Sequence, residues 1–201
     1  MAEKDITEKL LNDIDEVFAD IYNNLCFNGE NIIKPDDLSS ASVTTAFISN
    51  DVTRGLISDV SKIYKNSNLT LALLNIENQS TEDSDMPFRI IGYEGAKYNS
   101  QLISGSNARY VVATLVLNFN TKKRWSTPKS IKESLKDKYP DQLDEYINDY
   151  KVNVIDVAFM DKEDIEKLNS DFKAVAKYYI LKEIILKILK NSVQNIRIHL
   201  H

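Results

Sequence analysis

The sequence predicts an α/β sandwich, in which helices flank a mixed central sheet. Three observations indicate this class. The N-terminal segment carries apolar residues at helical spacing, residues 110–119 form the near-continuous apolar run of a central strand covered on both faces, and helical and strand-like segments follow one another along the chain. The order helix, hairpin, helix, strand, helix, strand, helix suits helical layers packed on one sheet.

The N-terminal segment predicts one amphipathic helix of about 20 residues. Asp5 and Glu8 have the spacing of a capping box. Apolar residues recur every three or four positions, at Ile6, Leu10, Ile14, Val17, Ile21 and Leu25. Asp13, Glu16 and Asp20 follow the same rhythm and therefore form an acidic ridge on a different face of the helix.

Residues 56–64 and 69–79 predict the two strands of an antiparallel hairpin. Side chains alternate between the two faces of a strand, so Glu77 and Gln79 point the same way at the end of the second strand. Asp85 as the capping residue, with Pro87 in the first turn, then predicts a helix. That helix runs to about residue 102 and is followed by a strand at 110–119, a basic loop at 122–130, a helical pattern to about 146, a strand at 152–159 and one or two helices over 161–195.

Composition excludes several classes of site. The single cysteine, Cys26, cannot form an internal disulfide, and with only His199 and His201 as imidazoles there is no Cys/His zinc site and little scope for histidine catalysis. The apolar stretches are short and the N-terminus is charged, which predicts neither a membrane span nor a signal peptide. We therefore expect a cytoplasmic protein without a membrane partner.

Charge is distributed unevenly along the chain. The net charge is −5, but residues 1–100 hold 17 acidic and 8 basic residues (net −9), whereas residues 101–201 hold 13 acidic and 17 basic residues (net +4). This asymmetry could place a metal-attracting half beside a phosphate-attracting half. Scattered, solvated charge is the alternative interpretation.

Carboxylates carry the chemistry that the sequence allows, because the usual nucleotide-binding, hydrolase, metalloprotease and dinucleotide motifs are absent. Asp59 and Glu77 lie on the two strands of the predicted hairpin. If the hairpin turn centres on Asn68 they stand directly opposite each other; a turn centred between Asn66 and Ser67 separates them by about three residues, roughly 10 Å along the strand. Two such carboxylates can hold Mg²⁺. The alternative is a pair of structural acids at the rim of the sheet.

Longer matches resemble a known family. The segments Leu73-Leu-Asn-Ile-Glu-Asn-Gln-Ser80 and Asp85-Met-Pro-Phe-Arg-Ile-Ile-Gly-Tyr93 are similar to the recombination-promoting nuclease / putative transposase (Rpn) family. Further stretches resemble the same family in the same order: Phe18-Ala-Asp-Ile-Tyr-Asn23, Phe27-Asn-Gly-Glu30, Trp125-Ser-Thr-Pro-Lys-Ser130, Asn148-Asp-Tyr-Lys-Val-Asn153 and Ser170-Asp-Phe172. The resemblance implies a PD-(D/E)XK restriction-endonuclease-like sandwich.

The resemblance also implies roles for individual residues. Asp59 and Glu77 become the metal-binding and catalytic acids, and Gln79 occupies the position of the usual lysine. Because Gln79 is neutral, it can orient a water molecule or a phosphate but cannot supply positive charge. Asp20, or alternatively Glu16, becomes the first-helix acid. On the helix after the motif strand, Arg89 and Tyr93 either hold the scissile phosphate or support the acids, and ordinary helix packing is the alternative for both.

Basic residues gather in the loop after the presumed central strand. Lys122, Lys123, Arg124 and Lys129 form the densest cluster in the sequence, beside Trp125, and predict a contact with DNA phosphates. The alternative is a solvated loop with Trp125 packed inward.

The C-terminal segment carries an apolar stripe of Ile180, Ile184, Ile185, Ile188 and Leu189. Core packing is the first interpretation of this stripe, a homodimer contact the second and a membrane-surface helix the third. We expect residues 1–201 to form one nuclease-like domain, with residues 161–201 as a C-terminal helical extension.

These observations lead to a functional hypothesis. The chain is expected to be a Mg²⁺-dependent DNA endonuclease linked to recombination or mobile elements. A catalytically inactive protein of the same fold that binds nucleic acid or a protein partner is the second hypothesis, and a small α/β interaction module that forms a homodimer is the third.

Overall fold

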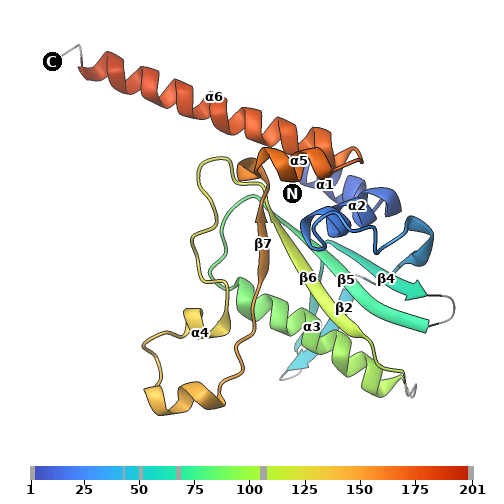
Figure 1. Ribbon diagram of the computed structural model, residues 1–201. Coiled ribbons are helices and arrows are strands. Elements are labelled where there is room, and N and C mark those ends of the chain that lie inside the picture. The colour runs from blue at the N-terminus through green and yellow to red at the C-terminus, as the bar shows by residue number, and fades with distance from the viewer. Residues whose placement is uncertain (1–2, 43, 50–51, 67–68, 105–107, 199–201) are drawn as a thin grey trace.

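A computed structural model describes residues 3–42, 44–49, 52–66, 69–104 and 108–198. Its main sheet has five strands in the order β1-β4-β5-β6-β7: β1 (Leu38–Ser40), β4 (Val60–Asn66), β5 (Leu69–Gln79), β6 (Val111–Asn118) and β7 (Asn153–Asp156). The pairs β1–β4 and β4–β5 are antiparallel, while β5–β6 and β6–β7 are parallel. The predicted α/β architecture with a mixed sheet flanked by helices is confirmed (Figure 1).

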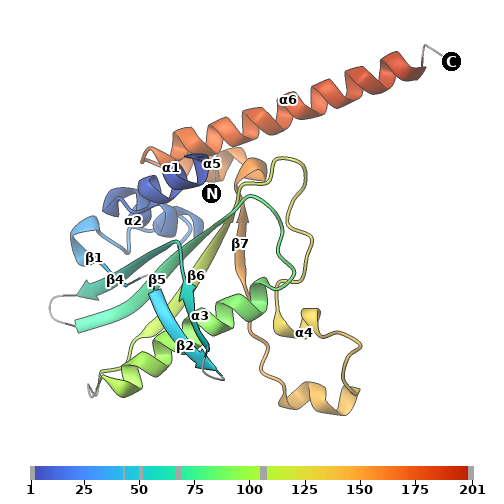
Figure 2. The ribbon, with the colours of Figure 1, turned by 180° about the vertical axis from the view of Figure 1, so that it is seen from behind.

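Two hydrophobic clusters cover the two faces of this sheet. Side chains of α2 and α6, including Phe18, Ile21 and Phe172, pack with Ile76 and Leu117 on one face. On the other face, α3 (Met86–Ile103) packs against β6, and Trp125 joins this second cluster. Figures 1 and 2 show α3 on the side of the sheet opposite to α1 and α2. Residues 112–117 of β6 are thus covered from both sides, as their apolar run predicted.

The expected single N-terminal helix is wrong. The segment forms α1 (Glu3–Asn12) and α2 (Asp15–Leu25), because Ile14 takes an extended conformation with ψ 125° and is 46% exposed. This break lets two carboxylates reach one buried cation: Lys62 Nζ lies 2.8 Å from Asp13 Oδ1 and 2.9 Å from Asp15 Oδ1. A buried ammonium needs such partners, and a continuous helix would set these two acids about 200° apart around its axis.

The expected strand over residues 56–64 is interrupted. Residues up to Ile57 belong to β3 (Val52–Ile57), which pairs with β2 (Thr44–Ser49) in a separate hairpin that the sequence analysis missed, together with the short edge strand β1. The main hairpin begins at Val60, which pairs with Ile76. This is the register in which Asp59, one residue earlier, stands across from Glu77. A bulge between Tyr64 and Lys65 separates this register from that of the turn.

The second half of the chain departs from expectation at two places. The helix expected to reach residue 146 is instead one turn of helix, α4 (Ile131–Ser134), and a 3-10 segment, η2 (Asp141–Tyr146), because Asp137 has a positive φ of 62° and Pro140 cannot donate a helical hydrogen bond. The expected strand at 152–159 ends at Asp156 and continues as η3 (Val157–Phe159). A further short 3-10 segment, η1 (Pro35–Asp37), precedes β1.

The C-terminal segment forms α5 (Lys162–Lys167) and the long helix α6 (Phe172–Ile198). The first turns of α6 are in the core, but its second half extends away from the sheet (Figures 1 and 2). Core packing is therefore wrong for most of the predicted stripe, since Ile184, Ile185, Ile188 and Leu189 are 44–59% exposed. Among the residues described, no helix is both long and apolar enough to cross a membrane.

Candidate metal centre

Asp59 and Glu77 meet where β5 ends and β4 begins. The Asp59 carboxylate accepts a 2.9 Å hydrogen bond at Oδ2 from the backbone N of Asn78, the residue after Glu77, and its charge acts on the Glu77 carboxyl group. Glu77 is 1% exposed, and the Asp59 side chain is 12% exposed. The fold thus brings the two predicted metal-binding acids into one small, nearly dry site.

Glu77 is held in an environment that opposes its ionisation. Burial, and then the nearby Asp59 carboxylate, raise the pKa of Glu77 from its ordinary value of 4.5 to about 8, although Arg89 acts in the opposite direction. Its Oε1 atom is buried and has no hydrogen-bond partner among the described residues. A buried carboxylate oxygen without a partner is costly for a purely structural acid, but it suits a cation ligand.

Two cations reach these carboxylates from different helices. Lys9 of α1 places its Nζ 2.5 Å from Asp59 Oδ1, with the lysine side chain 31% exposed. Arg89 of α3 places Nη2 3.7 Å from Glu77 Oε2. Each carboxylate therefore has one positive side chain beside it.

Arg89 is held firmly in place. Its Nη1 donates to Asp83 Oδ2 at 2.7 Å, and its Nε and Nη2 donate to the Tyr93 hydroxyl at 3.1 and 2.9 Å. The side chain retains 35% exposure. Of the roles suggested by the sequence, these contacts favour support of the acids, and the exposed part of the guanidinium remains accessible to a phosphate.

Polar side chains line the C-terminal ends of the parallel strands. Gln79 is half-buried, on the same face of β5 as Glu77, and it pairs in register with Asn118 of β6, which pairs in turn with Asp156 of β7. Asn118 Nδ2 donates to Asp156 Oδ1 at 2.7 Å. Ligands of sheets with parallel strands bind at this edge, so the two acids lie where a substrate would be expected.

The donor set fits a hard divalent cation. Within the described part of the chain, there is no group of three or more His, Cys, Asp or Glu side chains able to hold a metal ion. Mg²⁺, however, is commonly bound by one or two carboxylates together with water and substrate phosphates. Asp59 and Glu77 supply that minimum, and Glu77 Oε1 is free to ligate.

The predicted first-helix acid is engaged elsewhere. The Asp20 carboxylate accepts hydrogen bonds from the backbone N of Asn169, the backbone N and hydroxyl of Ser170, and the side chain of Asn24. These contacts fix the connection between α5 and α6. Glu16, the alternative acid, is exposed on α2. In the structure it is Lys9 of the preceding helix that contacts Asp59, so the first-helix position at this site carries a base in place of an acid.

Comparison with known proteins identifies the family. A family model described as "Putative transposase, YhgA-like" matches residues 8–200, which is nearly the whole chain. The chain belongs to this family. The resemblance seen in the sequence is thereby confirmed, and membership links the chain to mobile elements. No curated protein and no solved structure matches the chain.

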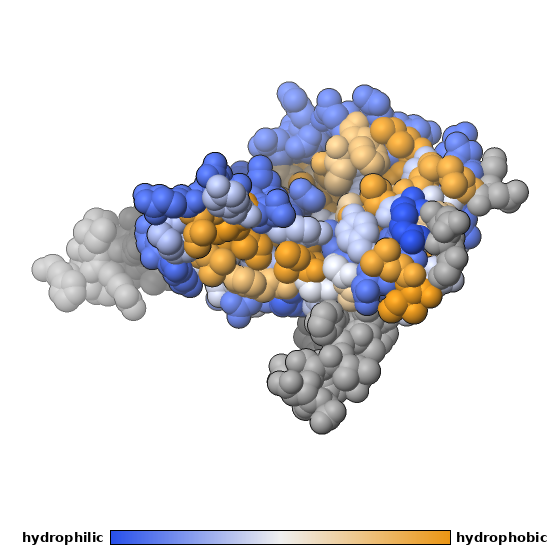
Figure 3. All heavy atoms as spheres, turned by 90° about the horizontal axis from the view of Figure 1, so that it is seen from below, coloured by the Kyte–Doolittle hydropathy of each residue, from blue (hydrophilic) through white to orange (hydrophobic). Residues whose placement is uncertain are grey.

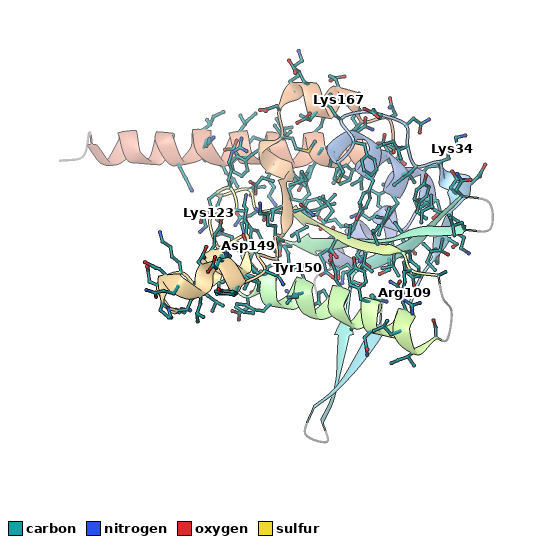
Figure 4. The ribbon with its side chains drawn as sticks, turned by 60° about the horizontal axis from the view of Figure 1, so that its bottom comes forward. Lys34, Arg109, Lys123, Asp149, Tyr150 and Lys167 are labelled. Carbon is teal, nitrogen blue, oxygen red and sulfur yellow. The ribbon has the colours of Figure 1, made fainter. Side chains whose placement is uncertain are left out.

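The basic loop of this family member is fixed to the edge of the sheet that holds the acids. Asp156 Oδ1 accepts from the backbone N of Trp125 at 2.8 Å, and Glu82 accepts from the backbone N of Ser126 and forms an ion pair with Lys123. Trp125 is 5% exposed and therefore packs inward, as the alternative interpretation of the loop predicted. Figure 4 shows Lys123 on this loop, between α4 and α6. The loop is therefore anchored at both Asp156 and Glu82.

The four predicted DNA-binding residues of this loop differ in their surroundings. Lys122 is exposed, whereas Lys123 is paired with Glu82. Arg124 donates to the carbonyl of Phe159 at 3.0 Å and lies 5.3 Å from the centre of the Phe159 ring. Lys129 is half-buried and lines a separate cavity on the sheet. Lys122, Lys123 and Arg124 are all exposed, but Arg124 is held against Phe159.

Sequence reasoning missed Lys9, Asp83 and Asp156. Lys9 interrupts no pattern, because it is one of several charged residues on an amphipathic helix, and only the fold brings it to Asp59. Asp83 lies in the polar segment before α3, six residues from Arg89, and an acid placed so close before a helix was a usable signal. Asp156 ends the last strand, and acids at the C-terminal ends of parallel strands are a second usable signal.

Proposed function

We propose that this member of the transposase family is a Mg²⁺-dependent DNA endonuclease with a PD-(D/E)XK-type fold. The observation that carries the proposal is the buried Glu77 carboxylate, whose Oε1 has no hydrogen-bond partner in the described structure and which adjoins Asp59 at the end of β5. The order of hairpin, α3 and parallel β6 around these acids supports the fold assignment.

Asp59 and Glu77 would hold the cation. When bound, Mg²⁺ supplies Lewis-acid activation of a phosphodiester and lowers the pKa of a water molecule. The protein holds the two acids ready for it: the Asn78 N–H orients the Asp59 carboxylate, and Arg89 lies 3.7 Å from Glu77 Oε2. The Asp59 acceptor is fixed by a backbone group of the hairpin, so its position depends little on side-chain flexibility.

Positive charge at the site comes from side chains other than residue 79. Gln79 occupies the position that the resemblance gives to a lysine, and its amide can orient a water molecule by hydrogen bonds but carries no charge. We assign the charge to Lys9, beside Asp59, and to Arg89, beside Glu77. Cations fixed near a phosphate stabilise the negative charge that develops during its hydrolysis.

Lys122 and Lys123 would guide DNA to this edge of the sheet. They lie on the loop that Asp156 and Glu82 fix beside the C-terminal ends of the parallel strands. Contacts between lysines and phosphates carry no sequence information, so we assign to this loop a general affinity for the DNA backbone.

A second candidate function is DNA binding without cleavage. The observation that favours it is the ion pair between Lys9 and Asp59, since the ammonium group occupies the Asp59 oxygen that a cation would need. In this case Lys9 is a structural counterion, and Asp59 and Glu77 stabilise the hairpin only.

Nicking of supercoiled plasmid DNA distinguishes the two functions. Purified wild-type protein should convert the plasmid to the open-circular form with Mg²⁺ and not with EDTA. Asp59→Asn and Glu77→Gln should each abolish nicking, while Asp141→Asn, at an exposed carboxylate in η2, should retain it. Salt-sensitive DNA binding by a wild-type protein that does not cleave would support the second function.

A further inference from the structure

The middle of α6 presents an apolar surface to solvent. Six large side chains between positions 178 and 189 are 44–59% exposed: Tyr178, Leu181, Ile184, Ile185, Ile188 and Leu189. The first turns of α6 are fixed in their own copy through Phe172, Ala176 and Tyr179. Because α6 is one continuous helix, its second half is directed past the domain and cannot fold back onto the sheet (Figures 1 and 2).

A second apolar surface lies on the sheet itself. A cavity of about 800 Å³ opens to solvent near the starts of β5 and β6, lined by Leu25 and Phe27 at the end of α2 and by Leu74, Val111 and Leu115 of the sheet. Seen from below, apolar side chains are exposed at this end of the molecule and are bordered by hydrophilic ones (Figure 3). Exposed apolar surfaces of this kind mark contact sites for other molecules.

The rim of the cavity on the α2 side is opposite in charge to α6. Residues 178–190 of α6 contain three lysines and one glutamate, a net charge of +2. Residues 26–37, which supply Cys26, Phe27 and Ile33 to the cavity wall, contain three acids and one lysine, a net charge of −2. Two copies of α6 would repel each other, whereas α6 and the rim formed by residues 26–37 attract; Lys129 lies on another part of the cavity wall.

We propose that the chain forms a two-fold dimer in which α6 of each copy lies over the sheet cavity of the other. The contact is reciprocal, so both apolar surfaces of both copies are covered and the assembly closes without exposing a further binding surface. In each copy the partner helix supplies the helical cover that an α/β sheet requires on this part of its face. This inference goes beyond the proposed nuclease function and does not depend on it.

The only cysteine in the sequence provides a direct test, because Cys26 lines the cavity. Leu181→Cys, Ile185→Cys and Ile188→Cys would each place a thiol on the exposed face of α6. At least one of these variants should form a disulfide-linked dimer under mild oxidation, visible on a non-reducing gel. The same substitution in a Cys26→Ser background should remain monomeric on that gel. Crosslinking that persists without Cys26 would instead assign α6 to pair with α6, and would overturn the proposal.

Solution mass gives an independent test by light scattering. Wild-type protein should be a dimer, and both Leu181→Glu/Ile185→Glu and Val111→Glu should be monomers with native circular dichroism. Mixing these two variants should restore a dimer, because one intact helix then meets one intact cavity. Ile103→Glu, at a side chain 76% exposed on α3 and outside the cavity, is the control and should remain dimeric.

Three results would contradict the reciprocal dimer. The first is a wild-type monomer, including one that co-sediments with anionic lipid vesicles, since that would assign α6 to a membrane surface. The second is a dimer that Leu181→Glu/Ile185→Glu disrupts and Val111→Glu leaves intact. The third is failure of the two monomeric variants to associate when mixed.

Discussion

Glu77 connects the stability of the fold to the chemistry of the site. Its carboxyl group is buried beside Asp59, and the raised pKa means that the folded protein retains a proton that the unfolded chain releases at lower pH. The sign follows directly: the folded state binds more protons between the ordinary value of 4.5 and about 8, so the stability of the metal-free protein falls as the pH rises through that interval.

Glu77→Gln should therefore stabilise the metal-free protein at high pH. The effect should be on the order of a few kcal/mol at pH 8.5 and much smaller at pH 5, since one unit of pKa corresponds to about 1.4 kcal/mol. Thermal melts of wild type and variant at the two pH values measure the difference. The control is Asp141→Asn, whose melting temperature should follow that of the wild type. An equal shift at both pH values would show that the titration of Glu77 is not its cause.

Lys9 should contribute to turnover if it supplies the charge that Gln79 lacks. Lys9→Gln should lower kcat for Mg²⁺-dependent nicking by tenfold or more, roughly the effect of losing one electrostatic contact to a transition state, with a smaller change in KM. Lys9→Arg should recover part of the rate. Lys34→Gln, at an exposed lysine directly before η1, is the matched control. A variant faster than wild type would identify Lys9 as an inhibitory counterion.

The proximity of Asp59 and Glu77 could be predicted from sequence, but the contact of Lys9 with Asp59 could not. Strand alternation and hairpin pairing are local rules, and they place two residues on one face once the register is known. The register depended on a bulge at Tyr64, which no local signal marked. The contact of Lys9 with Asp59 joins residues 50 positions apart and requires the packing of α1 against the sheet.

At the scale of elements, Asp20 connects α2 to the start of α6. Asp20→Ala removes the acceptor for three donors of Asn169 and Ser170 and should lower the free energy of unfolding by about 1–3 kcal/mol. Denaturant titration measures this loss, and Glu16→Ala, at an exposed acid on the same helix, should change it little. Nicking activity per folded molecule should be unchanged. Loss of that activity in a folded Asp20→Ala protein would return Asp20 to the catalytic site.

The basic loop should act as a uniform DNA contact. Lys122→Ala combined with Lys123→Ala should weaken binding similarly for unrelated duplex sequences. It should also reduce the slope of log affinity against log salt by up to about 2, because each lost phosphate contact removes roughly 0.9 from that slope. Fluorescence anisotropy over a salt series measures both quantities. Lys34→Ala with Lys65→Ala is the charge-matched control, and an equal effect of the two pairs would place the DNA path elsewhere.

The elements that sequence reasoning misjudged share a cause. α1 and α2 separate at Ile14 so that Asp13 and Asp15 reach the buried Lys62, and residues 52–57 form another hairpin with β2. In both places the local pattern of apolar residues continues through the break. Tertiary contacts therefore decided what periodicity alone could not. By contrast, β5 and α3 agree with expectation because their own ends carry the signals, a turn and a proline.

For the whole molecule, the sheet places the acids, the anchored loop and the polar ends of β5–β7 at one edge. The exposed half of α6 and the cavity lie at other parts of the surface. The metal-binding acids that we propose and the two apolar surfaces that we assign to the dimer thus share no residue. Variants that make the protein monomeric should therefore leave a functional metal centre in each copy.

The central claim is that Asp59 and Glu77 form one divalent-cation site, and an anomalous-scattering map from a crystal soaked in Mn²⁺ tests it most directly. We expect a peak within ligand distance, about 2.0–2.3 Å, of Glu77 Oε1 and of an Asp59 carboxylate oxygen, with Lys9 displaced from Asp59. The peak should be absent from a Glu77→Gln crystal treated in the same way. A wild-type map with no peak between the two acids, or with Mn²⁺ peaks only elsewhere, would contradict the account.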